Sequence, residues 1–364
     1  MLSNINLNLP LNPTSFGNIG VLILRELFEL KAEPNLFVIG NADLASQTNM
    51  SPEFVGWINN CVNKANSNFK RKYPSFSLWH LNSSHTRIGN KNVLLSFVET
   101  DSPTPAELNI VKNQDKVLFS CNYTTNIFKE CGAENVFTIP LAFDKYNFHR
   151  KDKKYHDGDR IVVNIFSKFE ARKAHDKIIR ILTKRYGNNN RFQFNFAIYN
   201  PFFSENDNKA LIARALDGKN YWNFSFLPWL PTNAHFNDYL NSGDIFIGAS
   251  QGESWGLPEM HSLAIGKWGA IHNATGYKEF ATKANSILFP SCGKVNAADG
   301  IFFHQGQPFN QGNFFSWDEE DFIAAFEKSV ETFQKTPINS EGLKLQEQFT
   351  SKRMVSEILY HLEN

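Results

Sequence analysis

The residues best suited to chemistry lie between Ile247 and Phe280. The apolar run 244–248 predicts a buried strand, and a loop of small residues with one carboxylate, Glu253, follows it before a helix expected over 259–265. At the carboxyl edge of a parallel sheet, a strand, glycine-containing loop and helix N-terminus hold an anionic group. A carboxylate repels phosphate but accepts hydrogen bonds from sugar hydroxyls. The stretch therefore indicates a sugar-nucleotide site.

This stretch resembles the donor-binding signature of retaining glycosyltransferases with the GT-B fold, glycosyltransferase family 4. The family pattern is Glu-Gly-Phe-Gly-Leu-Pro, two residues, Glu, then Ala-Met-Ala-x-Gly, whereas residues 253–266 read ESWGLPEMHSLAIG. The family's second glutamate, which holds the ribose hydroxyls, falls on His261, and a neutral imidazole accepts only one hydrogen bond. Glu259 is two residues earlier, on another side of the helix. The resemblance implies a set of donor-binding residues: Glu253, Ser254, Trp255, Gly256, Leu257, His261 and Glu279, the last after the turn at 275–278.

A second segment, 166–175, reads FSKFEARKAH and resembles the family's Gly-Arg…Glu-Lys-Gly segment. By this match Lys168 takes the place of the family arginine, Lys173 is the family lysine, and Ala174 replaces a glycine. Breaking a sugar–diphosphate bond places negative charge on the leaving group, and two fixed cations stabilise it by several kcal/mol. Lys168 offers a point charge where arginine would bind two oxygens. Catalytic roles are therefore expected for Lys168, Lys173 and Glu253; the alternative for the lysines is an ordinary basic helix start.

The amino-terminal half carries weaker signals. Residues 13–20 (PTSFGNIG) resemble the family's N-terminal glycine loop, so Gly17 is expected near the donor and Ser15 and Phe16 near the acceptor; the alternative is an ordinary strand-to-helix turn. Glu99 ends an expected strand where relatives place an acidic pair near the acceptor, and a solvated strand end is the alternative. His85 and Arg87, in a loop, are further acceptor candidates, with a structural or solvated role as the alternative.

Length and composition fit two domains without a dominant charge. A chain of 364 residues suits two domains of about 150 residues or more. Lys plus Arg number 37 and Asp plus Glu 36, so charge dictates neither a nucleic-acid nor a membrane partner. The four cysteines include no Cys-x-x-Cys pair, which argues against zinc and for a reducing compartment. No secretory signal and no apolar run of about 18 residues is evident.

The element pattern predicts an α/β fold, because strands alternate with helices. The resemblance implies GT-B, with two Rossmann-like domains whose parallel sheets face across a cleft. We expect an acceptor domain at 1–145, a linker at 146–160, a nucleotide-sugar donor domain at 161–335, and a terminal helix at 336–364 that crosses back to the first domain. The alternative for the charged linker is a surface loop within one domain. Strands are expected at 4–9, 36–40, 76–81, 93–98, 117–120, 136–139, 161–166, 192–198, 223–227, 244–248 and 286–289, and helices at 19–30, 51–70, 175–186, 206–216, 235–240, 318–333 and 341–362.

The resulting hypothesis is a retaining glycosyltransferase that moves a sugar from a UDP- or GDP-type donor to an acceptor hydroxyl. Retention, implied by the resemblance, lets the departing phosphate oxygen take the acceptor proton, so no side-chain base is required. No metal site and no cofactor beyond the co-substrate are expected. A glycan or glycolipid acceptor is expected, and a modified base of phage DNA is an alternative. The competing hypotheses for the whole protein are an epimerase, a phosphorylase and an inactive sugar-nucleotide-binding scaffold. The expected location is cytoplasmic, at a membrane periphery or in a host cytoplasm if the protein is viral.

Overall fold

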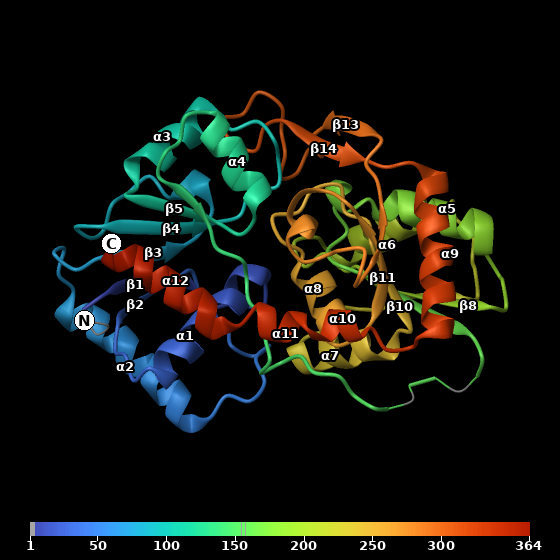
Figure 1. Ribbon diagram of the computed structural model, residues 1–364, viewed down its shortest axis with the longest axis horizontal. Coiled ribbons are helices and arrows are strands. Elements are labelled where there is room, and N and C mark those ends of the chain that lie inside the picture. Colours follow the sequence, from blue (N-terminus) through green and yellow to red (C-terminus); the bar gives the residue numbers. More distant parts are fainter. Residues whose placement is uncertain (1–3, 154, 157) are drawn as a thin grey trace. The chain divides into compact units, whose positions relative to one another are not determined.

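The computed structural model describes residues 4–153, 155, 156 and 158–364, and its contacts divide the chain into two compact units (Figure 1). Unit 1 contains the chain up to Asn147 together with His304–Gly312 and Glu347–Asn364. Unit 2 contains Phe148–Phe303 and Asn313–Gln346. Residues 1–3 of the expected first domain, and residues 154 and 157 of the expected linker, lie outside the described residues.

Unit 1 is built on a six-stranded parallel sheet in the order β2-β1-β3-β4-β5-β6. All five residues of β4 are buried, as is typical of a strand covered by helices on both faces. The C-terminal helix α12 packs along α1 within this unit (Figure 1). The elements of unit 1 are β1 (Asn6–Pro10), α1 (Ser15–Glu29), β2 (Asn35–Ile39), α2 (Pro52–Asn68), β3 (Ser75–Leu78), η1 (Leu81–Ser83), β4 (Asn92–Ser96), α3 (Pro105–Asn113), β5 (Lys116–Phe119), α4 (Asn122–Glu130), β6 (Val136–Thr138) and α12 (Ser351–Glu363).

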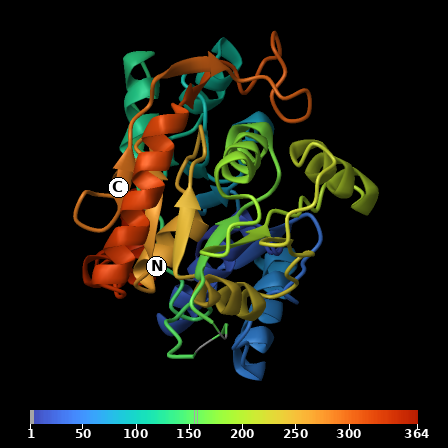
Figure 2. The same ribbon diagram turned by 90° about the vertical axis from the view of Figure 1, so that its right-hand side faces the viewer.

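Unit 2 repeats the architecture with a parallel sheet in the order β12-β11-β10-β7-β8-β9. Its central strand β7 is buried at all six positions. Helix α9 packs along β11 and β12 (Figure 2). Its elements are β7 (Ile161–Phe166), η2 (Ala171–Lys173), α5 (His175–Tyr186), β8 (Phe192–Ala197), α6 (Glu205–Ala215), β9 (Phe224–Phe226), α7 (Asn233–Ser242), β10 (Ile245–Gly248), α8 (Leu257–Ala264), β11 (Trp268–His272), η3 (Thr275–Glu279), β12 (Ile287–Phe289), β13 (Gly293–Asn296), β14 (Asn313–Ser316), α9 (Glu319–Lys335) and α10 (Ser340–Leu343). The short helix α11 (Leu345–Gln348) contains the division between the units, which falls after Gln346.

The two units are therefore Rossmann-like α/β domains, and the fold class predicted from the sequence is confirmed. Within the part of the chain that the structure describes, no helix combines the length and the apolar character needed to cross a membrane.

Three parts of the chain differ in secondary structure from the sequence expectation: α3, the strand pair β13–β14, and the C-terminal helices. Helix α3 was not predicted, because its residues show no clear apolar period. The sequence does carry two signals of a helix start there: Thr104 and Glu107 form a capping box, and Pro105 opens the helix. Strands β13 and β14 form an antiparallel pair, and β13 is exposed throughout, so no alternation marked it. The helix expected over 341–362 is instead α10, α11 and α12, and Thr350 caps the last by accepting a hydrogen bond from the Arg353 backbone N–H.

Between β13 and β14 the chain contributes His304–Gly312 to unit 1. This segment, which we call the excursion, is fixed by the buried side chain of Glu107. One carboxylate oxygen accepts the backbone N–H of Asn310 (2.9 Å) and the other accepts that of Thr104 (2.8 Å). Phe309 packs against the apolar cluster beneath α3. No sequence pattern marks the excursion, because its anchor is an ordinary helix-capping glutamate.

Candidate active site

The two charged segments found in the sequence meet because their strands are neighbours. β10 pairs with β7 in parallel, with Ile247 opposite Ile165. Parallel neighbours end at the same edge of the sheet, so the loops that follow them, 167–174 and 249–256, converge. The backbone N–H of Gln251 donates to the carbonyl of Arg172 (2.7 Å), which locks one loop to the other.

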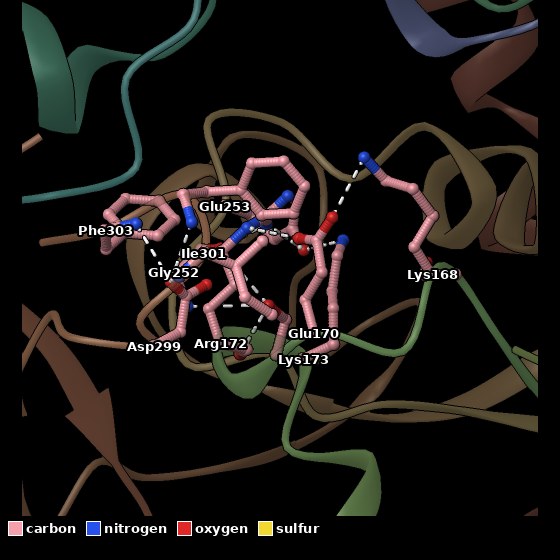
Figure 3. Close-up of polar contacts among 12 residues, drawn as sticks. Lys168, Glu170, Arg172, Lys173, Gly252, Glu253, Asp299, Ile301 and Phe303 are labelled. Carbon is pink, nitrogen blue, oxygen red and sulfur yellow. Dashed lines mark hydrogen bonds and ion pairs between the residues drawn. The ribbon is translucent and has the colours of Figure 1, made fainter. Parts of the chain in front are cut away.

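Five charged side chains of these loops form one chain of ion pairs (Figure 3). Lys168 Nζ lies 2.9 Å from Glu170 Oε1, and Arg172 Nε lies 3.1 Å from Glu170 Oε2. Arg172 Nη1 is 3.2 Å from Glu253 Oε1, which also accepts a hydrogen bond from Lys173 Nζ. The sequence predicted Lys168, Lys173 and Glu253; it missed Glu170 and Arg172, which lie in the same segment.

The backbone of Glu253 is fixed by hydrogen bonds to residues of η3. Its N–H donates to Thr275 Oγ1 (3.0 Å), and its carbonyl accepts the N–H of Gly276 (2.9 Å). Gly276 is required there, since a Cβ at this position would overlap the Ser254 carbonyl group and the Trp255 nitrogen. The turn at 275–279, noted in the sequence only for Glu279, therefore positions the proposed sugar-binding carboxylate.

Glu170 and Glu253, the two carboxylates in the chain of ion pairs, are both ionised. Burial favours the neutral form of Glu253, but Lys173 and Arg172 hold its pKa below the ordinary value. Burial acts on Glu170 in the same way, and Arg172, Lys168 and Lys173 outweigh it and lower the pKa of that carboxyl to about 2. The cations therefore face two negative charges in a poorly solvated site, where electrostatic interactions are strong.

The depressed pKa of Glu170 predicts a pH-dependent contribution to stability. The contribution is fully present above the unfolded-state value of 4.5 and is lost as the pH falls toward about 2. A pKa shift of this size corresponds to a stabilisation of the folded state by about 3 kcal/mol. In urea unfolding, the free energy of unfolding of the wild type is expected to exceed that of Glu170→Gln by a constant amount from pH 7 to pH 5. This difference is expected to become smaller at pH 4 and pH 3.5. A difference that does not change with pH would contradict this assignment.

A third carboxyl, Glu259, lies in the first turn of α8, directly after the loop 249–256. Its Oε1 accepts the hydroxyl of buried Tyr277 (2.7 Å), and its Oε2 makes no hydrogen bond to any described residue. Burial, partly offset by Lys173, raises the pKa of Glu259 to about 6. Glu259 was not predicted to replace the family's second glutamate, because it lies on another side of α8 from residue 261. The pairing with Tyr277, 18 residues further along, was not visible in the sequence.

His261 occupies the position of the family's second glutamate and is buried. Its ring stacks on Phe148 with centroids 4.1 Å apart and an interplanar angle of 17°. Burial lowers the pKa of His261 to about 3, so the ring is neutral. The structure therefore gives this position an aromatic packing role, and ribose binding by His261 stays a prediction.

The remaining residues that were predicted to bind the donor lie in or near α8 and η3. Gly256 caps the helix with φ of +97°, and Pro258 stands in its first turn. Trp255 is buried and packs against Phe280, with ring centroids 5.4 Å apart. Ser254 and Leu257 are also buried, and Glu279 ends η3 half-buried.

The segment 166–175 has left-handed backbone at two positions. Ala174, at a family glycine position, has φ of +57°, and Ser167 has φ of +86°. Left-handed backbone favours glycine, so this chain keeps the shape with other residues. Lys168 Nζ lies 4.8 Å from the ring centre of Phe202 and 5.8 Å from that of Phe302. These aromatic contacts, absent from the sequence hypothesis, restrict where the Lys168 ammonium can go.

A groove of about 640 Å³ lies beside α6 and the carboxyl ends of β8 and β9. Its lining includes Tyr199 and Trp229, which follow these two strands, together with Ile212 and Leu227. The groove is mostly apolar with polar groups at intervals, as is usual for small-molecule sites. Its strands β8 and β9 follow β7 in the sheet order, and its lining contains no residue of the loops 167–174 and 249–256.

In unit 1, the structure brings together only some of the acceptor candidates. Ser15, Phe16 and Gly17 form the first turn of α1, which starts earlier than expected. A Cβ on Gly17 would overlap the backbone of Asn12, so the close approach requires glycine. Phe16 packs against two aromatic residues that follow β3, and its ring centroid lies 5.7 Å from that of Trp79 and 4.4 Å from that of His80.

Glu99 follows β4 and shares this carboxyl edge of the first sheet. Arg87 instead pairs with Asp115 (2.5 Å), which also binds the N–H of Asn92 at the start of β4. Arg87 and the nearby His85 therefore lie toward the amino edge, away from the edge that Glu99 shares, and their acceptor role stays a prediction. The sequence did not single out Trp79 and His80, because both fell inside the strand expected at 76–81, whereas β3 ends at Leu78.

Among the described residues, no group of three or more His, Cys, Asp or Glu side chains could hold a metal ion. Metal independence stays a prediction, for which the positive charge of Lys168, Arg172 and Lys173 supplies the physical basis.

No protein-family model matches the chain, and no curated protein matches its sequence. Solved structures match its fold. Anabaena Alr3699/HepE in complex with UDP and glucose gives a TM-score of 0.68 at 14% identity, covering 100% of both chains. A sucrose-phosphate synthase from Thermosynechococcus elongatus gives 0.65 at 11%, covering 98% of both, and TarM gives 0.56 at 14%, covering 85% of this chain and 58% of that chain. At these identities the likeness establishes the fold, which is GT-B as predicted.

Proposed function

We propose that the protein is a retaining glycosyltransferase that uses a nucleoside-diphosphate sugar. The observation that carries this proposal is the chain of ion pairs at the carboxyl ends of β7 and β10, where three cations pair with two carboxylates. Cations fixed beside a leaving diphosphate stabilise the charge that develops on it. Glu253 is the group suited to the hydroxyls of the donor sugar.

The donor's parts can be assigned to elements of unit 2. The diphosphate would meet Lys173, Arg172 and Lys168, and the sugar would meet Glu253 and the backbone of 254–257. The nucleoside would extend toward the groove that contains Tyr199 and Trp229. Alr3699/HepE was solved with UDP-glucose, which makes UDP-sugars the first donors to test.

The acceptor would be bound by unit 1 through Phe16, Trp79, His80 and Glu99. Aromatic faces and a carboxylate suit a sugar ring with its hydroxyls, which favours a glycan or glycolipid acceptor. No side-chain base is assigned, because in a retaining reaction the departing phosphate oxygen can take the acceptor proton. The cytoplasmic location stays a prediction.

A donor screen in the presence of chelator tests the proposal. UDP-, GDP-, ADP- and TDP-sugars are incubated with the protein, and release of free nucleoside diphosphate is measured. Release from one donor, unchanged by chelator, would support a metal-independent transferase and identify its nucleotide. Binding without release would favour the inactive scaffold, and release that needs a divalent cation would refute metal independence.

A further inference from the structure

Glu253 has two possible sets of partners, and the structure contains only one of them. Its Oε1 already accepts hydrogen bonds or ion-pair contacts from Lys173 and from Arg172 (3.2 Å). Both cations are those that the leaving diphosphate would need. A site in this state offers a diphosphate little unbalanced positive charge, since three cations in the chain face two carboxylates.

Burial makes these pairs costly to rearrange. Glu253, Arg172 and Lys173 are each less than a tenth exposed, at 6%, 8% and 7%. An anion that binds Lys173 alone would remove Lys173 from Glu253. The buried Glu253 carboxylate would then have lost one partner and would lie near a second negative charge. Leaving a buried charge without compensation is strongly unfavourable.

We propose that Glu253 is a counter-ion that makes the site selective for the intact sugar nucleotide over free diphosphates. The sugar hydroxyls donate to the Glu253 carboxylate and replace Lys173 and Arg172, which then turn to the diphosphate. A nucleoside diphosphate or inorganic pyrophosphate brings no such hydroxyls and must compete with Glu253. Selectivity arises from an unfavourable contact with the wrong ligand as well as a favourable one with the right ligand. This inference rests on the proposed function.

Glu170 provides an internal comparison. It pairs with Lys168 and Arg172, whereas Lys173 pairs with Glu253. Its removal also deletes one negative charge from the cluster, yet it leaves the Lys173–Glu253 contact in place. Glu331 provides a surface comparison, because it is about half exposed on α9 and pairs with Lys328 (3.1 Å) on the same helix.

The test is calorimetric titration of inorganic pyrophosphate, UDP and UDP-glucose into the wild type and Glu253→Gln at one pH. Glu253→Gln is expected to bind pyrophosphate and UDP at least tenfold more tightly than the wild type. The affinity for UDP-glucose should rise less, so the ratio of UDP-glucose affinity to UDP affinity should fall by about tenfold. Glu170→Gln should change UDP and UDP-glucose affinity by the same factor, and Glu331→Gln should change neither. If the glutamine variant does not fold, Glu253→Ser removes the same charge and carries the same expectation.

Unchanged or weaker pyrophosphate binding by a folded Glu253 variant would overturn the counter-ion role. This result differs from failure of the proposed function, in which no sugar nucleotide is turned over in the donor screen. Pyrophosphate requires only the cations, so a gain in its affinity supports the counter-ion role even if the donor is not UDP-glucose. Turnover of a donor without that gain would preserve the transferase and refute the counter-ion.

Discussion

Replacing Lys173 with methionine is expected to lower the rate of sugar transfer by about 10²–10³-fold, the usual effect of removing one preorganised group that stabilises transition-state charge. Lys173 is buried, and η2 fixes its backbone, whose N–H donates to the Glu170 carbonyl (3.0 Å). Methionine keeps the aliphatic stem and removes the charge. The measurement is kcat and kcat/KM for the donor identified in the screen. Both constants should fall together, because the charge is needed most when the bond breaks.

Lys184 supplies the matched control for this variant. It lies on α5 with 72% of its side chain exposed, and its contact with Glu319 is long, at 3.4 Å. Lys184→Met is expected to leave turnover unchanged. Lys168→Met is expected to lower turnover by about tenfold, an effect between those of Lys173→Met and Lys184→Met. The Lys168 ammonium is partly solvated, and solvated charges are screened. Turnover of a folded Lys173→Met variant within about threefold of wild type would place the leaving group elsewhere.

Replacing Gly256 with alanine is expected to destabilise unit 2 by about 2–5 kcal/mol, the sum of a backbone cost and a packing cost. The left-handed backbone at φ of +97° costs an L-residue roughly 1–2 kcal/mol. The added Cβ would also overlap the ring of Tyr277, which is fully buried, and overpacking costs roughly 1–3 kcal/mol. The Tyr277 ring can yield only by disturbing its hydrogen bond to Glu259. A lower midpoint of urea unfolding is the measurement.

Gly218 separates the two contributions. It also has positive φ, +67°, and a Cβ there would meet nothing within 4 Å. Gly218→Ala should therefore show the backbone cost alone, about 1–2 kcal/mol. Equal losses in the two variants would mean that the Tyr277 contact does not constrain the loop, and the support proposed for Glu253 from η3 would be weakened.

The amino-acid sequence was sufficient to predict the alternation of strands and helices and the two loops that carry charge. Strands β7 and β10 are buried runs whose ends are marked by a change to small and polar residues. Such patterns are local, since burial of a parallel strand on both faces selects continuous apolar residues. Lys168, Lys173 and Glu253 could be found because they stand directly after these strands and because the segments resemble a known signature.

Elements without an apolar face were harder to predict. Strand β13 is exposed along its whole length, and the excursion is held by one capping glutamate, Glu107. Neither leaves a periodic pattern, because its stability comes from backbone hydrogen bonds and from contacts with segments distant in the chain. The division of the C-terminal segment into α10, α11 and α12 likewise depends on caps at Asn339 and Thr350.

The sharing of charge within the site depends on the tertiary fold. That Arg172 joins Glu170 to Glu253 follows from the pairing of β7 with β10, which brings residues 80 positions apart into one buried cluster. The stacking of His261 on Phe148 and the Glu259–Tyr277 pair arise in the same way. The sequence specifies which groups are present and on which loops, because strand burial is a local property. Only the folded chain specifies which charge neutralises which, because that depends on distance and on the exclusion of water.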